Sequence, residues 1–196
     1  MSSASTRHPA AARRRHRRQS GFTLIEAALA TVIISTGVLS ILAAQQAYHR
    51  KNNWANHSGT AMLLANEIRE LTYGLPMHDP ITGTSFLGAE PGENSVALYD
   101  DLDDFAGEVT NGKGTGVTFS PPINALRETI PNMTGWSQHV MVENVLEDHI
   151  SVTSGNTLPL GTTNLMRMTV TVYYQSPADD TPQAMGTLMW VVGESR

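Results

Sequence analysis

The longest apolar segment of the chain lies close to its start. Residues 22–47 contain a single charged side chain, Glu26. As an α-helix, this segment would be about 39 Å long, which is enough to cross a hydrocarbon core of about 30 Å. The pattern therefore predicts a membrane-spanning helix with one carboxylate near its N-terminal end.

A second hydrophobic pattern follows at helical spacing. Apolar side chains recur along one face and polar side chains cover the other; the apolar set is Ala61, Leu64, Ala65, Ile68 and Leu71. Gly74 and Pro76 are typical of the end of a helix. We therefore expect one helix over 22–73, with a first half (22–47) that is apolar all round and a second half that packs on a globular domain.

The remaining residues, 74–196, predict long loops followed by a small sheet. Gly, Pro, Asn and Asp are frequent over 75–135, which indicates little regular structure. The expected strands are 139–145, 165–174 and 185–192, within a sheet over 138–192, with a turn at 177–182. Alternating apolar and polar residues and the turn between the last two strands indicate an antiparallel hairpin. The predicted fold is α+β: a long N-terminal helix packed on a small C-terminal antiparallel β-sheet.

The charge of the chain changes sign after its first segment. Residues 1–21 contain six arginines and no acid, whereas residues 22–196 contain 7 Lys+Arg against 18 Asp+Glu, which leaves a net charge of −11. A basic tail of this kind is either a nucleic-acid-binding arm or the cytoplasmic flank of a membrane segment. The adjacent apolar run favours the flank, which places the N-terminus in the cytoplasm and the globular domain outside. Because the rest of the chain is acidic and would repel phosphate, no nucleic-acid partner is expected.

Two other export signals fit the segment less well. An ordinary secretory signal has an apolar run of about 7–15 residues and an A-x-A site after it, and this chain has a longer run without such a site. A twin-arginine signal would rest on Arg17 and Arg18 alone, and such pairs arise readily within an arginine cluster.

The position of Glu26 needs a reason, because a carboxylate in a bilayer costs about 2.5–3.5 kcal/mol on insertion scales. It could lie at the cytoplasmic interface. A cut between Gly21 and Phe22 offers another reason, since it would remove all six arginines and leave an α-amine four residues before Glu26. In an assembly of staggered helices, that amine could neutralise Glu26 of a neighbouring subunit.

These features together resemble the N-terminal class III signal of type IV prepilins and type II secretion pseudopilins. The resemblance rests on the basic leader, the sequence GFTLIE at residues 21–26 and the long apolar helix. It implies that a prepilin peptidase cuts after Gly21 and methylates the amine of Phe22, and that Glu26 acts in filament assembly. The implied partners are the peptidase, other pilins or pseudopilins, the inner-membrane assembly platform and, before assembly, membrane lipid. The runs at 32–46 and 61–70 look most like those of PilV-type minor pilins.

The globular domain contains one further candidate site, a run of acidic residues. The run consists of Asp100, Asp101, Asp103 and Asp104. Carboxylate oxygens are ligands that calcium prefers, although the two residues after the run depart from an EF-hand loop. The alternative is a solvated acidic turn with Tyr99 and Phe105 directed inward. The histidines lack zinc-site spacing, and residues 107–113 fit G-x-x-x-x-G-K without the Ser/Thr, strand or helix of a P-loop, so calcium is the one cofactor considered.

Two functions compete. The first is a minor type IV pilin-like structural subunit, not an enzyme, whose leader 1–21 is removed and which moves from the bacterial inner membrane into a pilus or pseudopilus. The chain has no cysteine and so lacks the pair common in major type IVa pilins, which favours a minor subunit. The alternative is an uncleaved single-pass membrane anchor for an extracytoplasmic binding or enzymatic domain. That alternative predicts that the arginines are retained and that Glu26→Ala is tolerated.

Overall fold

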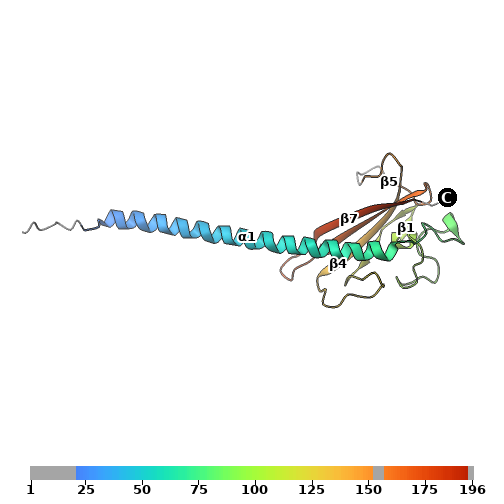
Figure 1. Ribbon diagram of the computed structural model, residues 1–196, viewed down its shortest axis with the longest axis horizontal. Helices are drawn as coiled ribbons and strands as arrows, with labels where there is room; N and C mark the ends of the chain where they lie inside the picture. Colours follow the sequence, from blue (N-terminus) through green and yellow to red (C-terminus); the bar gives the residue numbers. More distant parts are fainter. Residues whose placement is uncertain (1–20, 152–156, 194–196) are drawn as a thin grey trace, which may run out of the picture. The chain divides into compact units, whose positions relative to one another are not determined.

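The computed structural model describes residues 21–151 and 157–193. The chain divides into two compact units, Met1–Tyr48 and His49–Arg196. Helix α1 (Leu24–Thr72) supplies most of the described part of the first unit and the first element of the second (Figure 1). The predicted helix over 22–73 is therefore confirmed to within two residues at its start and one at its end. Among the described residues, α1 is the one helix that is long and apolar enough to cross a membrane.

Three hydroxyl groups within the apolar part of α1 are satisfied by the helix itself. The hydroxyl groups of Thr31, Thr36 and Ser40 donate to backbone carbonyl oxygens one turn earlier, at 2.8–3.0 Å. Such bonds are favourable where no water is available to replace them. These three hydroxyl groups therefore need no partner outside the helix.

The second unit, here called the head, contains an antiparallel sheet in the order β3-β4-β6-β7 (Figure 1). Its strands are β3 (Val117–Phe119), β4 (Trp136–Val145), β6 (Leu165–Tyr174) and β7 (Gln183–Gly193), and β5 (Thr157–Leu158) pairs with β4. Strands β1 (Val109–Thr110) and β2 (Lys113–Gly114) form a separate two-stranded sheet, and two short 3₁₀ helices are η1 (Gly83–Ser85) and η2 (Asp103–Ala106).

All three predicted strands and the antiparallel hairpin are confirmed, the first and last strands beginning two or three residues earlier than expected. The prediction of loops alone over 75–135 is too simple, because β1, β2, β3 and both 3₁₀ helices lie there. These elements are two to four residues long, so pairing with a neighbour, rather than a hydrophobic pattern of their own, determines them.

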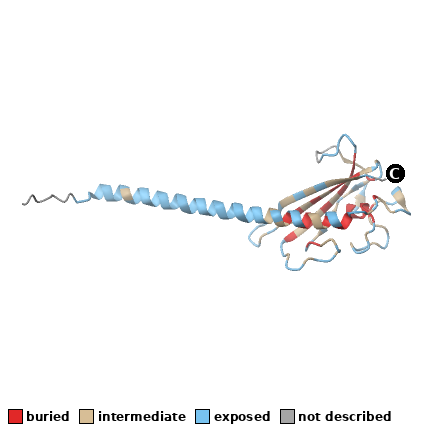
Figure 2. Cartoon of the chain, viewed as in Figure 1, coloured by how far each residue is buried: buried red, intermediate tan, exposed pale blue. Residues whose placement is uncertain are grey.

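The C-terminal part of α1 packs on the sheet with the side chains that the helical pattern predicts. Ala61, Leu64, Ala65, Ile68 and Leu71 are all buried (Figure 2). On the sheet, Met166, Met168, Val170 and Val172 alternate into the same core. A Cβ atom on Gly186 of β7 would lie 3.2 Å from the Cβ of Ala61, so two small residues allow the helix to approach this strand closely.

Polar contacts fix the position of α1 on the sheet. Fully buried Gln138 donates from Nε2 to the carbonyl oxygen of Leu64 at 2.8 Å and to that of Ile123 at 3.1 Å, and its Oε1 accepts from Ile123 N–H at 2.8 Å. The Ser58 hydroxyl donates to the carbonyl oxygen of Met185 at 3.0 Å. Apolar packing alone would allow the helix to slide, whereas these directional bonds specify one position.

Candidate functional site

The segment before α1 is exposed and non-helical. Residues 21–23 have no regular secondary structure, and the Phe22 side chain is 76 % exposed. A Cβ atom at Gly21 would contact nothing within 4 Å. The peptide bond between Gly21 and Phe22 therefore lies in an exposed, non-helical segment that a protease could bind without unwinding a helix.

Helix α1 begins with a capping box. Thr23 precedes the first helical residue, and its Oγ1 accepts from Glu26 N–H at 3.4 Å. In return, Glu26 Oε2 accepts from the backbone N–H of Thr23 at 3.4 Å and from its hydroxyl at 3.2 Å. The cap satisfies backbone N–H groups that the first helical turn leaves without a partner.

The capping box gives Glu26 a role that our interpretation of the sequence missed. The carboxylate lies at the positive end of the helix dipole, where a negative charge is stabilising. The signal was present, because Thr-x-x-Glu before an apolar run is the sequence pattern of this cap. Glu26 therefore has a partner within its own chain.

The first unit exposes its apolar side chains all round α1. Ten of them, between 49 % and 90 % exposed, are Leu24, Ile25, Leu29, Val32, Ile33, Ile34, Val38, Leu39, Ile41 and Leu42. Figure 2 shows this part of the helix as exposed along nearly its whole length. A helix that is apolar all round is stable only in lipid or among other helices. This surface therefore needs an apolar environment that the chain does not itself provide.

Residues 16–42 match the family model described as the prokaryotic N-terminal methylation motif. The chain carries a type IV prepilin-like class III signal. Its α+β architecture, one long N-terminal helix packed against antiparallel β-sheets, fits a pilin-like fold. Neither the curated proteins nor the solved structures include a match to this chain.

The motif supports a type IV pilin-like precursor and suggests a structural subunit rather than an enzyme. It implies processing by a prepilin peptidase and assembly with other pilins. Together with the apolar helix, it is consistent with a membrane-anchored single-pass pilin. The exposed apolar surface of the first unit agrees with both of the environments in which such a subunit is found, lipid and a bundle of helices.

The acidic run of the head is mostly buried, so the alternative of a solvated turn is wrong for three of its four members. Asp101, Asp103 and Asp104 are at most 1 % exposed, and Asp100 is exposed. The cause lies in the residues between them, since Leu102 and Phe105 occupy the core and draw the turn inward. The predicted inward packing of Tyr99 and Phe105 is confirmed by edge-to-face ring contact, with centroids 5.2 Å apart.

The oxygens of Asp103 are occupied by the chain itself. Its Oδ1 accepts from Gly88 N–H at 2.8 Å, and its Oδ2 contacts Nδ1 of His78. Asp103 therefore joins two loop segments and has no free oxygen directed toward the other acids. Two glutamates from residues 88–93 approach Asp104 instead, and our interpretation of the sequence did not include them: Glu90 and Glu93.

Burial and mutual repulsion shift the protonation of these acids. Burial, reinforced by the charges of Asp103 and Asp104, raises the pKa of Asp101 to about 8. Burial likewise raises the pKa of Asp104 and that of Glu90. Without a cation, the cluster therefore binds protons that ordinary carboxylates would release.

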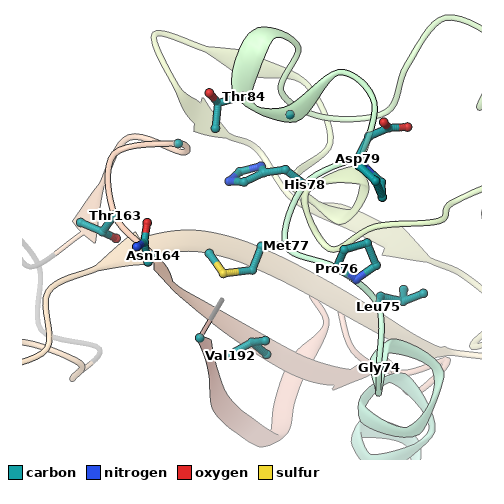
Figure 3. A pocket seen from close by; sticks show the side chains of 14 residues that line it. Gly74, Leu75, Pro76, Met77, His78, Asp79, Thr84, Thr163, Asn164 and Val192 are labelled. Carbon is teal, nitrogen blue, oxygen red and sulfur yellow. The ribbon is translucent and has the colours of Figure 1, made fainter. Parts of the chain in front are cut away.

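A pocket of about 690 Å³ is lined by residues from 74–84 and 161–164 and by the end of β7. Figure 3 shows His78 and Thr84 on one side and Thr163 and Asn164 facing them. The Thr163 hydroxyl donates to backbone carbonyl oxygens at 2.9 and 3.1 Å, so it is not poised as a nucleophile for His78. The His78–Asp103 contact is best explained as a structural link between the two loops.

Proposed function

We propose that the chain is a minor type IV pilin-like structural subunit that is processed by prepilin peptidase and assembled into a type IV pilus or a type II secretion pseudopilus. The observation that carries this proposal is the methylation motif at residues 16–42, followed by a helix whose apolar side chains are exposed all round. Neither feature has a use in a free, water-soluble domain.

Processing occurs between Gly21 and Phe22, and the new amine of Phe22 is methylated. The exposed, non-helical backbone at residues 21–23 supports this step, because a peptidase binds an extended strand. The absence of a side chain at Gly21 lets an enzyme approach the scissile bond closely. Removal of residues 1–21 takes away six arginines.

Before processing, the apolar part of α1 spans the bacterial inner membrane, with the basic leader in the cytoplasm and the head outside. After processing, the helix leaves the lipid and packs among the helices of other pilins or pseudopilins, with the help of the inner-membrane assembly platform. The amine of Phe22 of one subunit pairs with Glu26 of a neighbour. Two charges that are costly to bury alone compensate each other in that pair and set the stagger of the subunits.

Two features support a minor, PilV-type subunit. The chain has no cysteine pair in its head, and the runs at 32–46 and 61–70 resemble those of PilV-type proteins. Such a subunit acts as a structural part of the filament and has no catalytic role.

The decisive experiment determines the N-terminal residue and the intact mass of the protein, purified from membranes with and without active prepilin peptidase. We expect methylated Phe22 at the N-terminus only when the peptidase is active, and retention of the leader in Gly21→Val, because a branched side chain obstructs the scissile bond. A chain that keeps its six arginines in the presence of the peptidase would instead identify an uncleaved membrane anchor.

A further inference from the structure

Three carboxylates in the head each have an oxygen that is shielded from solvent and has no hydrogen-bond partner. These oxygens are Glu90 Oε2, Asp101 Oδ2 and Asp104 Oδ1. The side chains of Asp101 and Asp104 are fully buried. Because a buried oxygen without a partner is unfavourable, three at one place indicate that something outside the chain completes their coordination.

The other oxygen of each carboxylate is anchored by the chain. Glu90 Oε1 accepts from the Thr82 hydroxyl at 2.8 Å. Asp101 Oδ1 accepts from two backbone N–H groups of the turn 100–104, at 2.9 and 3.1 Å. Asp104 Oδ2 does the same, at 2.9 and 3.2 Å. One oxygen held and one oxygen free is the arrangement of a preorganised ligand.

The spacing within each of two overlapping groups of carboxylates fits a bound cation. Oxygens of Glu90, Glu93 and Asp104 all lie within 4.8 Å of one another, and so do oxygens of Asp100, Asp101 and Asp104. Two oxygens that bind one calcium ion, each at about 2.3–2.6 Å, are at most about 5 Å apart. Asp104 belongs to both groups and therefore joins them.

The charge of the cluster is not compensated by the chain. Within the described residues, the ion pairs are His78–Asp103, His149–Asp148 and Arg167–Glu143, and none of them involves Glu90, Glu93, Asp101 or Asp104. Buried charges in proteins are paired with an opposite charge or bind a metal ion. A divalent cation would supply the missing positive charge.

We propose that Asp104, Glu90 and Glu93 bind a calcium ion, and that Asp100 and Asp101 complete the site from the other side. All of these ligands are oxygens, whereas zinc and copper prefer nitrogen and sulfur ligands, so the site does not suit either metal. Calcium accepts six to eight oxygens in irregular geometry, whereas magnesium requires a near-ideal octahedron and retains water. The ion connects the loop 88–93 to the turn 100–104 and so stabilises the loop-rich side of the head. This site is independent of the N-terminal signal and of the proposed filament function.

The test uses the full-length protein in detergent, freed of metal with EDTA and titrated with calcium chloride in a calorimeter. We expect one saturable site with a Kd of about 10⁻⁴–10⁻³ M, the range of extracellular calcium modules. Glu90→Gln and Asp104→Asn should each weaken binding at least about tenfold, because each removes one charged ligand. Asp180→Asn removes an exposed acid elsewhere in the head and should bind calcium like the wild type. Magnesium should bind more weakly than calcium.

Two results would overturn the proposal. One is the absence of saturable binding by the wild type up to about 10 mM calcium, ten times the weakest expected Kd; the buried carboxyl groups would then share protons instead. The other is equal calcium binding by Glu90→Gln and Asp180→Asn. If Asp104→Asn does not fold, Glu90→Gln and Glu93→Gln decide the matter, because both glutamates are only half-buried.

Discussion

The buried amide of Gln138 gives the sharpest test of how α1 is held on the head. Replacing Gln138 with Leu keeps the size of the side chain and removes its three hydrogen bonds. Each bond contributes about 1 kcal/mol net, and the Ile123 N–H that loses its acceptor is buried and costs about 1–3 kcal/mol. The apolar leucine recovers part of this loss. We expect the free energy of unfolding to fall by about 3 kcal/mol, which lowers the Tm of a domain of this size by about 6–12 °C.

The assay is urea denaturation of the detergent-solubilised chain, followed by tryptophan fluorescence, to which Trp136, buried in the head, contributes. Gln175→Leu is the matched control, because Gln175 is exposed and its amide donates one bond, at 3.1 Å, within a surface turn. We expect this control to change stability by less than about 0.5 kcal/mol. If Gln138→Leu were no more destabilising than Gln175→Leu, the hydrogen bonds between α1, β4 and the preceding loop would not specify the packing.

Three further predictions concern the helix contact, the acidic cluster and the helix cap. Ala61→Leu should destabilise the head by about 1–3 kcal/mol in the same assay, because overpacking forces α1 off the sheet, whereas Leu63→Ala at an exposed position should have little effect. Since the pKa of Asp101 is about 8 in the folded chain and 3.8 is its ordinary value, the folded state binds an extra proton between these values. The Tm in EDTA should therefore fall as the pH rises from about 4 to about 8, and Asp101→Asn should flatten this dependence. Thr23→Ala and Glu26→Gln both weaken the helix cap, and Thr23→Ala should cost about 1 kcal/mol. Only Glu26→Gln should abolish filament assembly, measured as the amount of subunit recovered in filaments sheared from cells. Equal loss of assembly in the two variants would show that Glu26 acts only as a helix cap.

The elements that the sequence predicts well are those with a period of their own. The stripe from Ala61 to Leu71 repeats at helical spacing, and the residues of 165–174 alternate, so geometry alone assigns their buried faces. Strand β3 has three residues, and it is a strand because β4 pairs with it. No local pattern of three residues could have predicted that pairing.

Burial of polar side chains could not be predicted in the same way. Gln138 and Arg167 are both buried, yet each lies in a strand where a polar residue ordinarily indicates the solvent face. Arg167 is covered because its guanidinium pairs with Glu143 at 2.6 Å and contacts the carbonyl oxygens of residues 150 and 151. Tertiary packing decides which loop covers a strand, and no periodic pattern in a single sequence predicts it.

The acidic cluster could be predicted from the sequence only in part. The run of aspartates was a visible candidate for calcium, and its apolar neighbours Leu102 and Phe105 indicated which way the turn would face. The run did not indicate that Asp103 would be occupied by the chain, or that glutamates from another loop would approach Asp104. Metal ligands gathered from separate irregular loops have no fixed spacing, so the structure was needed to assemble them.

The capping box changes how the charge of Glu26 is understood. The hydroxyl groups of Thr31, Thr36 and Ser40 bond to their own helix, and Glu26 bonds to Thr23, so these groups enter an apolar environment already satisfied. Loss of such a cap costs about 1 kcal/mol, which is small compared with the several kcal/mol needed to bury an unpaired carboxylate. If assembly brings the amine of a neighbouring subunit to Glu26, loss of the cap therefore opposes that pairing only weakly. The same residue can then stabilise the start of the helix in the membrane and select the stagger of subunits in the filament.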